Sequence, residues 1–286
     1  MKNKLLFFFM TFLSFYNFAY ADIEVKSQNG NSVIFSQPKC GDNIELDAWD
    51  KLIFSQNGEE IDLSRADRYY TEDGSSKVSP GGNYLVVNSV AGDYLDSGNG
   101  AKKYVSKSYC SVIDMRSGCI VSDWDGEVCG YQWTKSQDIL SGSDNNDADT
   151  FDFLSMKPAV RKIKGSYSTL KTMDANNLMR CDKINNENVD DYQTLSKENQ
   201  EVRQTILNGI LNYINKLDIS SSISTSKSYL HSSPDENSIT KSYLVAGDNV
   251  KVIQLSQDKK WVEVGYVSSK GKPLVKWVRF EDIKQF

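Results

Sequence analysis

The side chains in this 286-residue chain that could do chemistry are one histidine, five cysteines and 38 carboxylates. Acyl transfer by Ser–His–Asp or Cys–His groups, and zinc chemistry with imidazole ligands, need a histidine beside the reacting group. His231 is the only histidine, and its place in a polar first turn predicts an exposed residue. We therefore expect no catalytic residues and no enzyme of these classes.

Two further chemistries depend on carboxylates: hydrolysis of glycosidic bonds and binding of calcium. A pair of acids can hydrolyse glycosidic bonds, and that alternative stays open for the acidic front of the chain. The stretch 144–152 is similar in composition to a calcium-binding loop. It lacks the Gly at position six and the Glu at position twelve of that loop, counted from Asp144. We expect a solvated loop there, and no metal or cofactor.

The five cysteines are expected in bridges if the chain is exported to an oxidising compartment. Hairpin turns at 115–118 and 123–126 would place Cys119 and Cys129 nearly opposite each other on adjacent strands. We therefore predict a Cys119–Cys129 bridge, with Cys40–Cys181 as the second pair and Cys110 free. Five cysteines do not fix the connectivity. A metal site is disfavoured because no C-x-x-C pair occurs.

The first 21 residues predict export. Lys2 and Lys4 precede an apolar run at 5–18, and Ala19-Tyr20-Ala21 has the small-x-small pattern of a cleavage site. The run is too short for a membrane span, and no later stretch is long enough for one. We predict a signal peptide at 1–21 and a mature protein in the periplasm. An uncleaved anchor and full secretion are the alternatives.

Charge is distributed unevenly along the chain. Residues 22–220 carry 21 Lys or Arg against 31 Asp or Glu, a net −10, whereas residues 221–286 carry ten against seven, a net +3. An acidic main domain argues against nucleic-acid binding, which needs a basic surface. It permits a basic partner for the front of the chain, and an ordinary solvated surface is the competing interpretation.

Residues 22–157 predict a β-rich domain. Short branched or aromatic runs alternate with turn signals at 56–58, 80–82, 116–118 and 124–126. The stretch at 79–140 has the pattern of a propeller blade. A propeller needs several such blades, and the sequence has one convincing copy and a weaker second copy at 44–62. A sheet or sandwich, or a partial propeller-like sheet stack, is therefore expected.

Residues 158–225 predict a connector of polar loops with one helix. Asn pairs at 176–177 and 185–188 are typical of loops. Ser196 is a good N-cap, and the apolar residues from Val202 to Leu217 recur at three- and four-residue steps. The helix either packs on a neighbouring domain or binds a partner. The Ser-rich stretch 219–225 predicts a linker.

Residues 226–286 predict a small β-barrel. Val250 and Val252, and then Val262 and Val264, alternate with period two, and Gly247-Asp248 marks a reversal. The Leu-x-x-Gly-Asp-x-Val-x-Val run at 244–252 is followed by Trp-Val pairs at 261–262 and 277–278. These motifs resemble the bacterial Src-homology-3-like (SH3-like) family, with Lys276 in place of the usual Gly before the final Trp. The whole chain is thus expected to be mainly β.

The resemblance implies binding of a cell-wall peptide or a protein ligand in an aromatic groove. The candidate ligand-binding residues are Tyr229, Tyr243, Trp261, Tyr266 and Trp277. Trp261 and Trp277 stand where the family buries its aromatics, so a core role is favoured for both.

Two functions follow from these observations. The first is a non-enzymatic periplasmic binding protein whose SH3-like domain holds a peptidoglycan peptide or a protein. The alternative is an immunity protein or inhibitor that neutralises a periplasm-targeted toxin or a cell-wall hydrolase.

Overall fold

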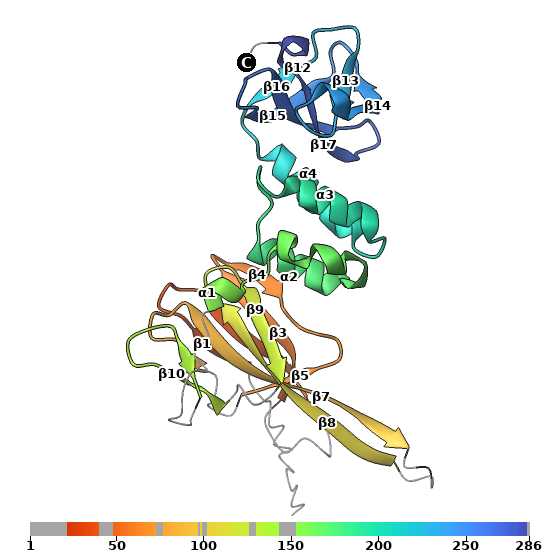
Figure 1. Cartoon of the computed structure of the whole chain (residues 1–286). Helices are drawn as coiled ribbons and strands as arrows, with labels where there is room; N and C mark the ends of the chain where they lie inside the picture. The colour runs from red at the N-terminus through yellow and green to blue at the C-terminus, as the bar shows by residue number, and fades with distance from the viewer. Residues whose placement is uncertain are drawn as a thin grey trace, which may run out of the picture.

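A computed structural model describes residues 22–39, 48–72, 77–96, 98, 102–125, 130–142 and 153–284. The predicted signal peptide, Cys40, Cys129 and the 144–152 stretch lie outside these residues. The described chain is mainly β, as predicted. A front sheet, a layer of helices and a C-terminal sheet follow one another along the molecule (Figure 1). No helix in the described ranges is both long and apolar enough to cross a membrane.

The front sheet has nine antiparallel strands in the order β1-β2-β3-β5-β7-β8-β9, with β4 paired to β3 and β6 to β7. A separate ribbon pairs β10 with β11. The strands are β1 (Ile23–Lys26), β2 (Ser32–Pro38), β3 (Ala48–Gln56), β4 (Glu59–Asp62), β5 (Tyr69–Thr71), β6 (Lys77–Val78), β7 (Tyr84–Asp96), β8 (Lys102–Asp114), β9 (Cys119–Asp125), β10 (Gln132–Trp133) and β11 (Leu140–Ser141).

Period-two alternation buries both faces of β7. Leu85 and Val87 enter a core with Phe35 and Phe54 of β2 and β3, so the two ends of the sheet pack on each other. Tyr84 and Val86 enter a second core on the opposite face. The continuous apolar run from Tyr84 to Val87 therefore reflects a strand covered on both sides, and the β-rich prediction for this part of the chain is confirmed.

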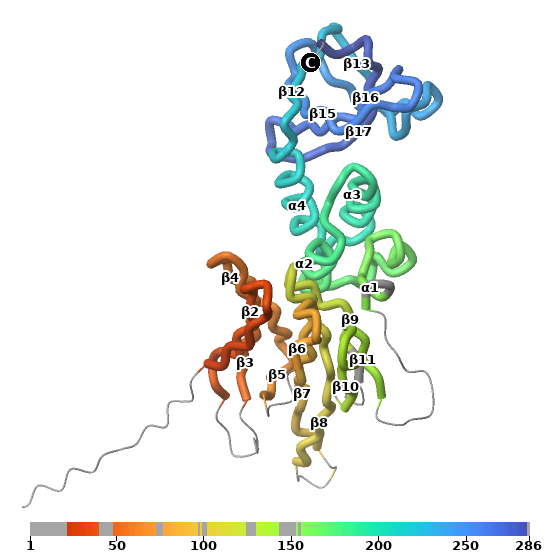
Figure 2. Tube along the Cα trace, turned by 90° about the vertical axis from the view of Figure 1, so that its left-hand side faces the viewer, coloured from red at the N-terminus to blue at the C-terminus, as the bar shows by residue number. Residues whose placement is uncertain are grey.

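The hairpin of β7 and β8 is longer than the sheet that carries it. The two strands pair without interruption from Tyr84↔Asp114 to Asp96↔Lys102. The neighbour β5 pairs with β7 only up to Val90, and β9 pairs with β8 only from Tyr109. The distal half of the hairpin consequently projects from the domain as a two-stranded arm (Figures 1 and 2).

The connector is more helical than predicted. It contains the 3₁₀ segment η2 (Val160–Thr169), α2 (Thr172–Cys181), α3 (Val189–Glu198) and α4 (Arg203–Asn215), and the short helix α1 (Phe153–Met156) precedes it. Ser196 lies inside α3 and is not an N-cap; its hydroxyl donates to the Gln193 carbonyl. The predicted apolar face holds for α4, where Ile206, Ile210 and Ile214 are buried. The loop predicted at 185–188 is the turn between α2 and α3.

The C-terminal sheet has six antiparallel strands in the order β12-β15-β16-β17-β13-β14. They are β12 (Ser220–Ser222), β13 (Ser228–His231), β14 (Ile239–Leu244), β15 (Asn249–Leu255), β16 (Trp261–Val267) and β17 (Pro273–Arg279), with 3₁₀ turns η3 (Glu236–Ser238) and η4 (Phe280–Asp282). Val250, Val252, Val262 and Val264 are buried, as predicted, and Gly247 has a φ of 89° in its turn.

Two expectations for this region are wrong. The stretch 219–225 is not a free linker, because β12 pairs with β15 and Ile223 bridges Ile283. The barrel is not closed by hydrogen bonds, since no ladder within the described residues joins β14 to β12. Helix α4 also packs directly on this sheet: a Cβ added at Gly265 would lie 2.8 Å from the Ile214 side chain. The helices and the C-terminal sheet therefore share one core.

Candidate functional site

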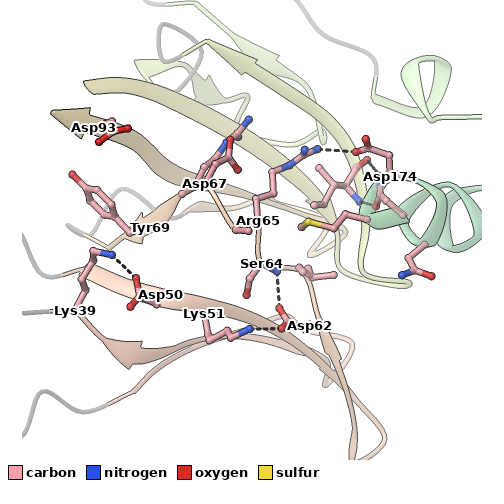
Figure 3. A pocket seen from close by; sticks show the side chains of 18 of the residues that line it. Lys39, Asp50, Lys51, Asp62, Ser64, Arg65, Asp67, Tyr69, Asp93 and Asp174 are labelled. Atoms are coloured by element: carbon pink, nitrogen blue, oxygen red, sulfur yellow. Dashed lines mark hydrogen bonds and ion pairs between the residues drawn. The ribbon is translucent and has the colours of Figure 1, made fainter. Parts of the chain in front are cut away.

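A cleft of about 1070 Å³ lies in the front domain, where β3, the loop at 63–68, β5, the β7–β8 arm and the start of α2 meet (Figure 3). None of the residues that line this cleft is among the candidate site residues predicted from the sequence. Five cationic and five anionic side chains line it. They are Lys39, Lys51, Arg65, Arg68, Arg180, Asp50, Asp62, Asp67, Asp93 and Asp174.

Two ion pairs run along the side of the cleft formed by β3 and β4. The Lys39 Nζ atom lies 2.8 Å from Asp50, and the Lys51 Nζ atom lies 2.7 Å from Asp62 (Figure 3). All four side chains are at least one-third exposed. Exposed pairs contribute little to stability, about 0–1 kcal/mol each. These charges can therefore exchange partners with a ligand at small cost.

Arginines of the 63–68 loop hold the deeper part of the cleft. Arg68 is nearly buried, lies 2.8 Å from Asp123 of β9 and stacks on the Tyr109 ring at 3.6 Å. Arg65 reaches Asp123 at 3.4 Å and Asp174 of α2 at 3.3 Å. The loop is thereby tied to both the sheet and the helix layer, and the cleft has a preformed floor.

Tyrosines form the wall next to the arm. Burial, followed by a hydrogen bond with Tyr104, raises the pKa of Tyr69 to about 12, so its phenol stays protonated at neutral pH. The Tyr104 ring lies 5.2 Å from that of Tyr94. Gly92 makes room for this arrangement, because a Cβ there would lie 2.0 Å from the Tyr104 hydroxyl. The tyrosines thus brace β5 against the arm.

Helix α2 closes the cleft through Asn177 and Arg180. The Asn177 side chain accepts from the Ile120 N–H at 2.8 Å and donates to the Ile120 carbonyl at 2.9 Å, as a neighbouring strand would. Arg180 donates to the Gly118 carbonyl, and burial lowers its pKa. In the described ranges no carboxylate lies within ion-pair distance of Arg180. An anionic group entering the cleft would therefore find a desolvated cation.

The lining is suited to binding a polar ligand of mixed charge. It offers guanidinium and ammonium donors, carboxylate acceptors and protonated phenols. Within the described ranges, no group of three or more His, Cys, Asp or Glu is placed to hold a metal ion.

The C-terminal aromatics predicted to bind ligand divide into two groups. Tyr229 and Tyr243 are 40% and 49% exposed, with ring centroids 6.1 Å apart. Lys227 lies over both rings, at 4.6 and 4.1 Å. Tyr266 is half-buried against the C-terminal core. Only the two exposed tyrosines thus form a surface that a ligand can reach directly.

The two tryptophans are packing residues, as favoured from their positions. Trp261 is 5% exposed, and its ring lies 4.6 Å from His231 in an edge-on contact. His231 is itself buried, and its Nδ1 lies 2.9 Å from the Asp235 carbonyl, so the prediction of an exposed histidine is wrong. The register shift in β13 between Tyr229 and His231 turns the imidazole into the sheet. Trp277 is 9% exposed.

Trp277 also borders a second pocket, of about 440 Å³, between α3 and the C-terminal sheet. Glu263 of β16 lies in its wall, 2% exposed, and accepts from the Gln254 amide at 2.7 Å. Burial raises the pKa of Glu263 to about 7, and the nearby Asp190 carboxylate adds to the shift while Lys276 opposes it. A carboxyl that titrates near neutrality thus lies between the helices and the sheet.

We predict that Glu263→Gln stabilises the protein at pH 8 and has little effect at pH 4.5. The folded-state pKa lies above the ordinary value of 4.5, so the folded state binds the extra proton. The stability that this proton contributes is complete below about pH 4.5 and is lost as the pH rises through 7. The amide keeps the hydrogen bond without the charge, and the expected gain at pH 8 is about 2–3 kcal/mol. Urea unfolding of both proteins across pH 4.5–8 checks this, and parallel curves would contradict it.

The cysteine pairing differs from the prediction. Cys119 bonds to Cys181, with Cα atoms 4.9 Å apart, so neither Cys119–Cys129 nor Cys40–Cys181 forms. Cys110 is disulfide-bonded as well, rather than free. Cys40 and Cys129 lie outside the described residues. The physical reason is α2, whose last residue meets the first residue of β9, so Cys119 bonds to the helix layer and not to a neighbouring strand of its own sheet.

Comparison with known proteins gives no relative. No family model matches this chain, and neither a curated protein nor a solved structure is similar to it.

Proposed function

We propose that this protein is an exported, non-enzymatic binding protein of the periplasm, and that the front-domain cleft holds a segment of a protein ligand. The observation that carries the proposal is the composition of the cleft wall. Tyrosine and arginine are the residue types that dominate protein-binding hot spots, and three of each line the cleft. Small-molecule sites are mostly apolar, whereas this lining carries charges of both signs.

The disulfides and the C-terminal surface support the same proposal. Bridged cysteines suit an oxidising compartment such as the periplasm. The exposed Tyr229–Tyr243 pair, with Lys227 across it, offers a second contact for a protein or a cell-wall peptide. In this proposal the SH3-like module anchors the protein and the cleft recognises its ligand.

Inhibition is the second candidate function. The net charge of −10 over residues 22–220 favours a basic protein as the ligand. An immunity protein or inhibitor that occupies a toxin or a cell-wall hydrolase would use such a charge to speed association. Turnover of peptidoglycan or peptides by the purified protein, abolished by one carboxylate substitution, would contradict both candidates.

Site-specific photocrosslinking in the periplasm of the native host tests the proposal. Benzoylphenylalanine replaces Met173 in the cleft, Tyr243 on the C-terminal surface, or Leu255 as a control; these side chains are 39%, 49% and 41% exposed. We expect Met173 to give an adduct with one protein and Leu255 to give none. An adduct with murein from Tyr243 alone would move recognition to the C-terminal module and contradict the cleft. No adduct from either site would contradict binding altogether.

A further inference from the structure

The cleft opens where the front sheet lacks a strand. β5 pairs with β7 at three positions, Tyr69↔Val90, Tyr70↔Ser89 and Thr71↔Asn88. Beyond Val90, β7 continues through residues 91–96 with β8 on one side. Within the described part of the chain, no strand lies on its other side. The outer edge of β7 at 91–96 therefore has the geometry of an edge strand open to pairing.

This free edge is also a wall of the cleft. Gly92, Asp93 and Tyr94 all line it. The chain before β5, at 63–68, does not pair with β7, and its Arg65 side chain reaches Asp174 of α2. The Tyr94 N–H donates to the Asp93 carboxylate at 2.7 Å, a local hydrogen bond that an incoming backbone can replace. A segment bound in the cleft thus lies within reach of the β7 backbone.

The charges that line the cleft indicate which side chains such a segment carries. The cleft carboxylates of Asp50, Asp62 and Asp174 have cationic partners. Asp67 and Asp93 have none in the described ranges, and Asp93 stands on the free edge beside Tyr69 (Figure 3). In an antiparallel pair of two copies centred between residues 94 and 95, Asp93 of one edge would face Asp96 of the other, and facing like charges destabilise a strand pair. The edge therefore selects a basic strand from another protein.

We propose that an extended, basic segment of a partner protein adds to the outer edge of β7 at residues 91–96 and places its cationic side chains beside Asp67 and Asp93. Backbone hydrogen bonds supply affinity in such strand addition, and alternate side chains supply specificity. This inference rests on the proposed function, since it assigns the class of ligand and its mode of binding to the same cleft.

Hydrogen exchange of the mature, full-length protein tests strand addition. The probe is an acetylated, amidated octapeptide of alternating Val and Lys, and the matched control alternates Val and Glu. We expect the Lys peptide to slow exchange of the backbone amides at 91–96 by about tenfold or more at saturation, and the Glu peptide to leave them unchanged. A Lys peptide methylated at every backbone nitrogen should lose this protection. Protection that survives methylation, or none at millimolar Lys peptide, overturns the proposal.

Substitutions test the charge assignment. Asp67→Asn with Asp93→Asn should weaken binding of the Lys peptide about five- to tenfold, as expected for two exposed ion pairs. Glu59→Gln with Glu60→Gln, on exposed positions of β4, is the matched control and should leave affinity unchanged. Equal losses in both variants would overturn the assignment. If benzoylphenylalanine at position 173 gives a protein adduct but the backbone amides at 91–96 gain no protection, strand addition is contradicted and the proposed function is not.

Discussion

A variant with both Cys119→Ser and Cys181→Ser is expected to unfold with about 3–4 kcal/mol less free energy than the wild type. The bridge joins residues 62 apart in sequence, and cross-linking a loop of that length restricts the unfolded chain by about this amount. It also fastens the end of α2 to the start of β9, on the side of the cleft where Asn177 and Arg180 lie. Urea unfolding monitored by tryptophan fluorescence measures the difference.

The double substitution is needed because a single free thiol can exchange with the bonded Cys110. Leu255→Ser, at an exposed position, is the control for introducing a hydroxyl and should cost about 0.5 kcal/mol or less. Unchanged stability of the double variant would mean that the packing of α2 on the sheet is sufficient without the bond. Peptide mapping under non-reducing conditions should recover the Cys119–Cys181 peptide from the wild type.

Strands were predictable from the sequence where burial of one face determined which residues are apolar. Val250, Val252, Val262 and Val264 alternate because one face of each strand is buried, and a period of two is visible without any tertiary information. Helix α2 was hidden by Asn176 and Asn177, which are typical of loops. Asn177 lies in mid-helix because its amide bonds the backbone of β9, a partner 57 residues away. Local propensity cannot anticipate a contact of that range.

The cleft was beyond sequence reasoning for a related reason. Its residues come from β3, the 63–68 loop, β5, β7, β8 and α2, and nothing in their spacing places them together. Arg65 and Arg68 belong to no recognisable sequence motif, and only the fold brings both of them to Asp123. The strand β7 has 13 residues, more than most strands, and its distal part extends beyond the neighbouring strand β5.

Trp261→Ala is expected to destabilise the protein by about 3–5 kcal/mol, the usual cost of deleting a buried tryptophan. Its ring is 5% exposed and packs on the buried imidazole of His231. Tyr229→Ala is the matched control, because Tyr229 is exposed and contributes one cross-strand pair with Tyr243. That control should cost about 1 kcal/mol or less. Thermal and urea unfolding of both variants measure the two costs.

The comparison also separates core from ligand surface in the C-terminal module. If the aromatic surface of this module binds ligand, Tyr229→Ala should lose binding while keeping its melting temperature, and Trp261→Ala should lose both together. A Trp261→Ala variant that kept its melting temperature would place that tryptophan in a ligand groove. Such a result would also contradict the packing of His231, because removing the indole leaves the imidazole beside a cavity.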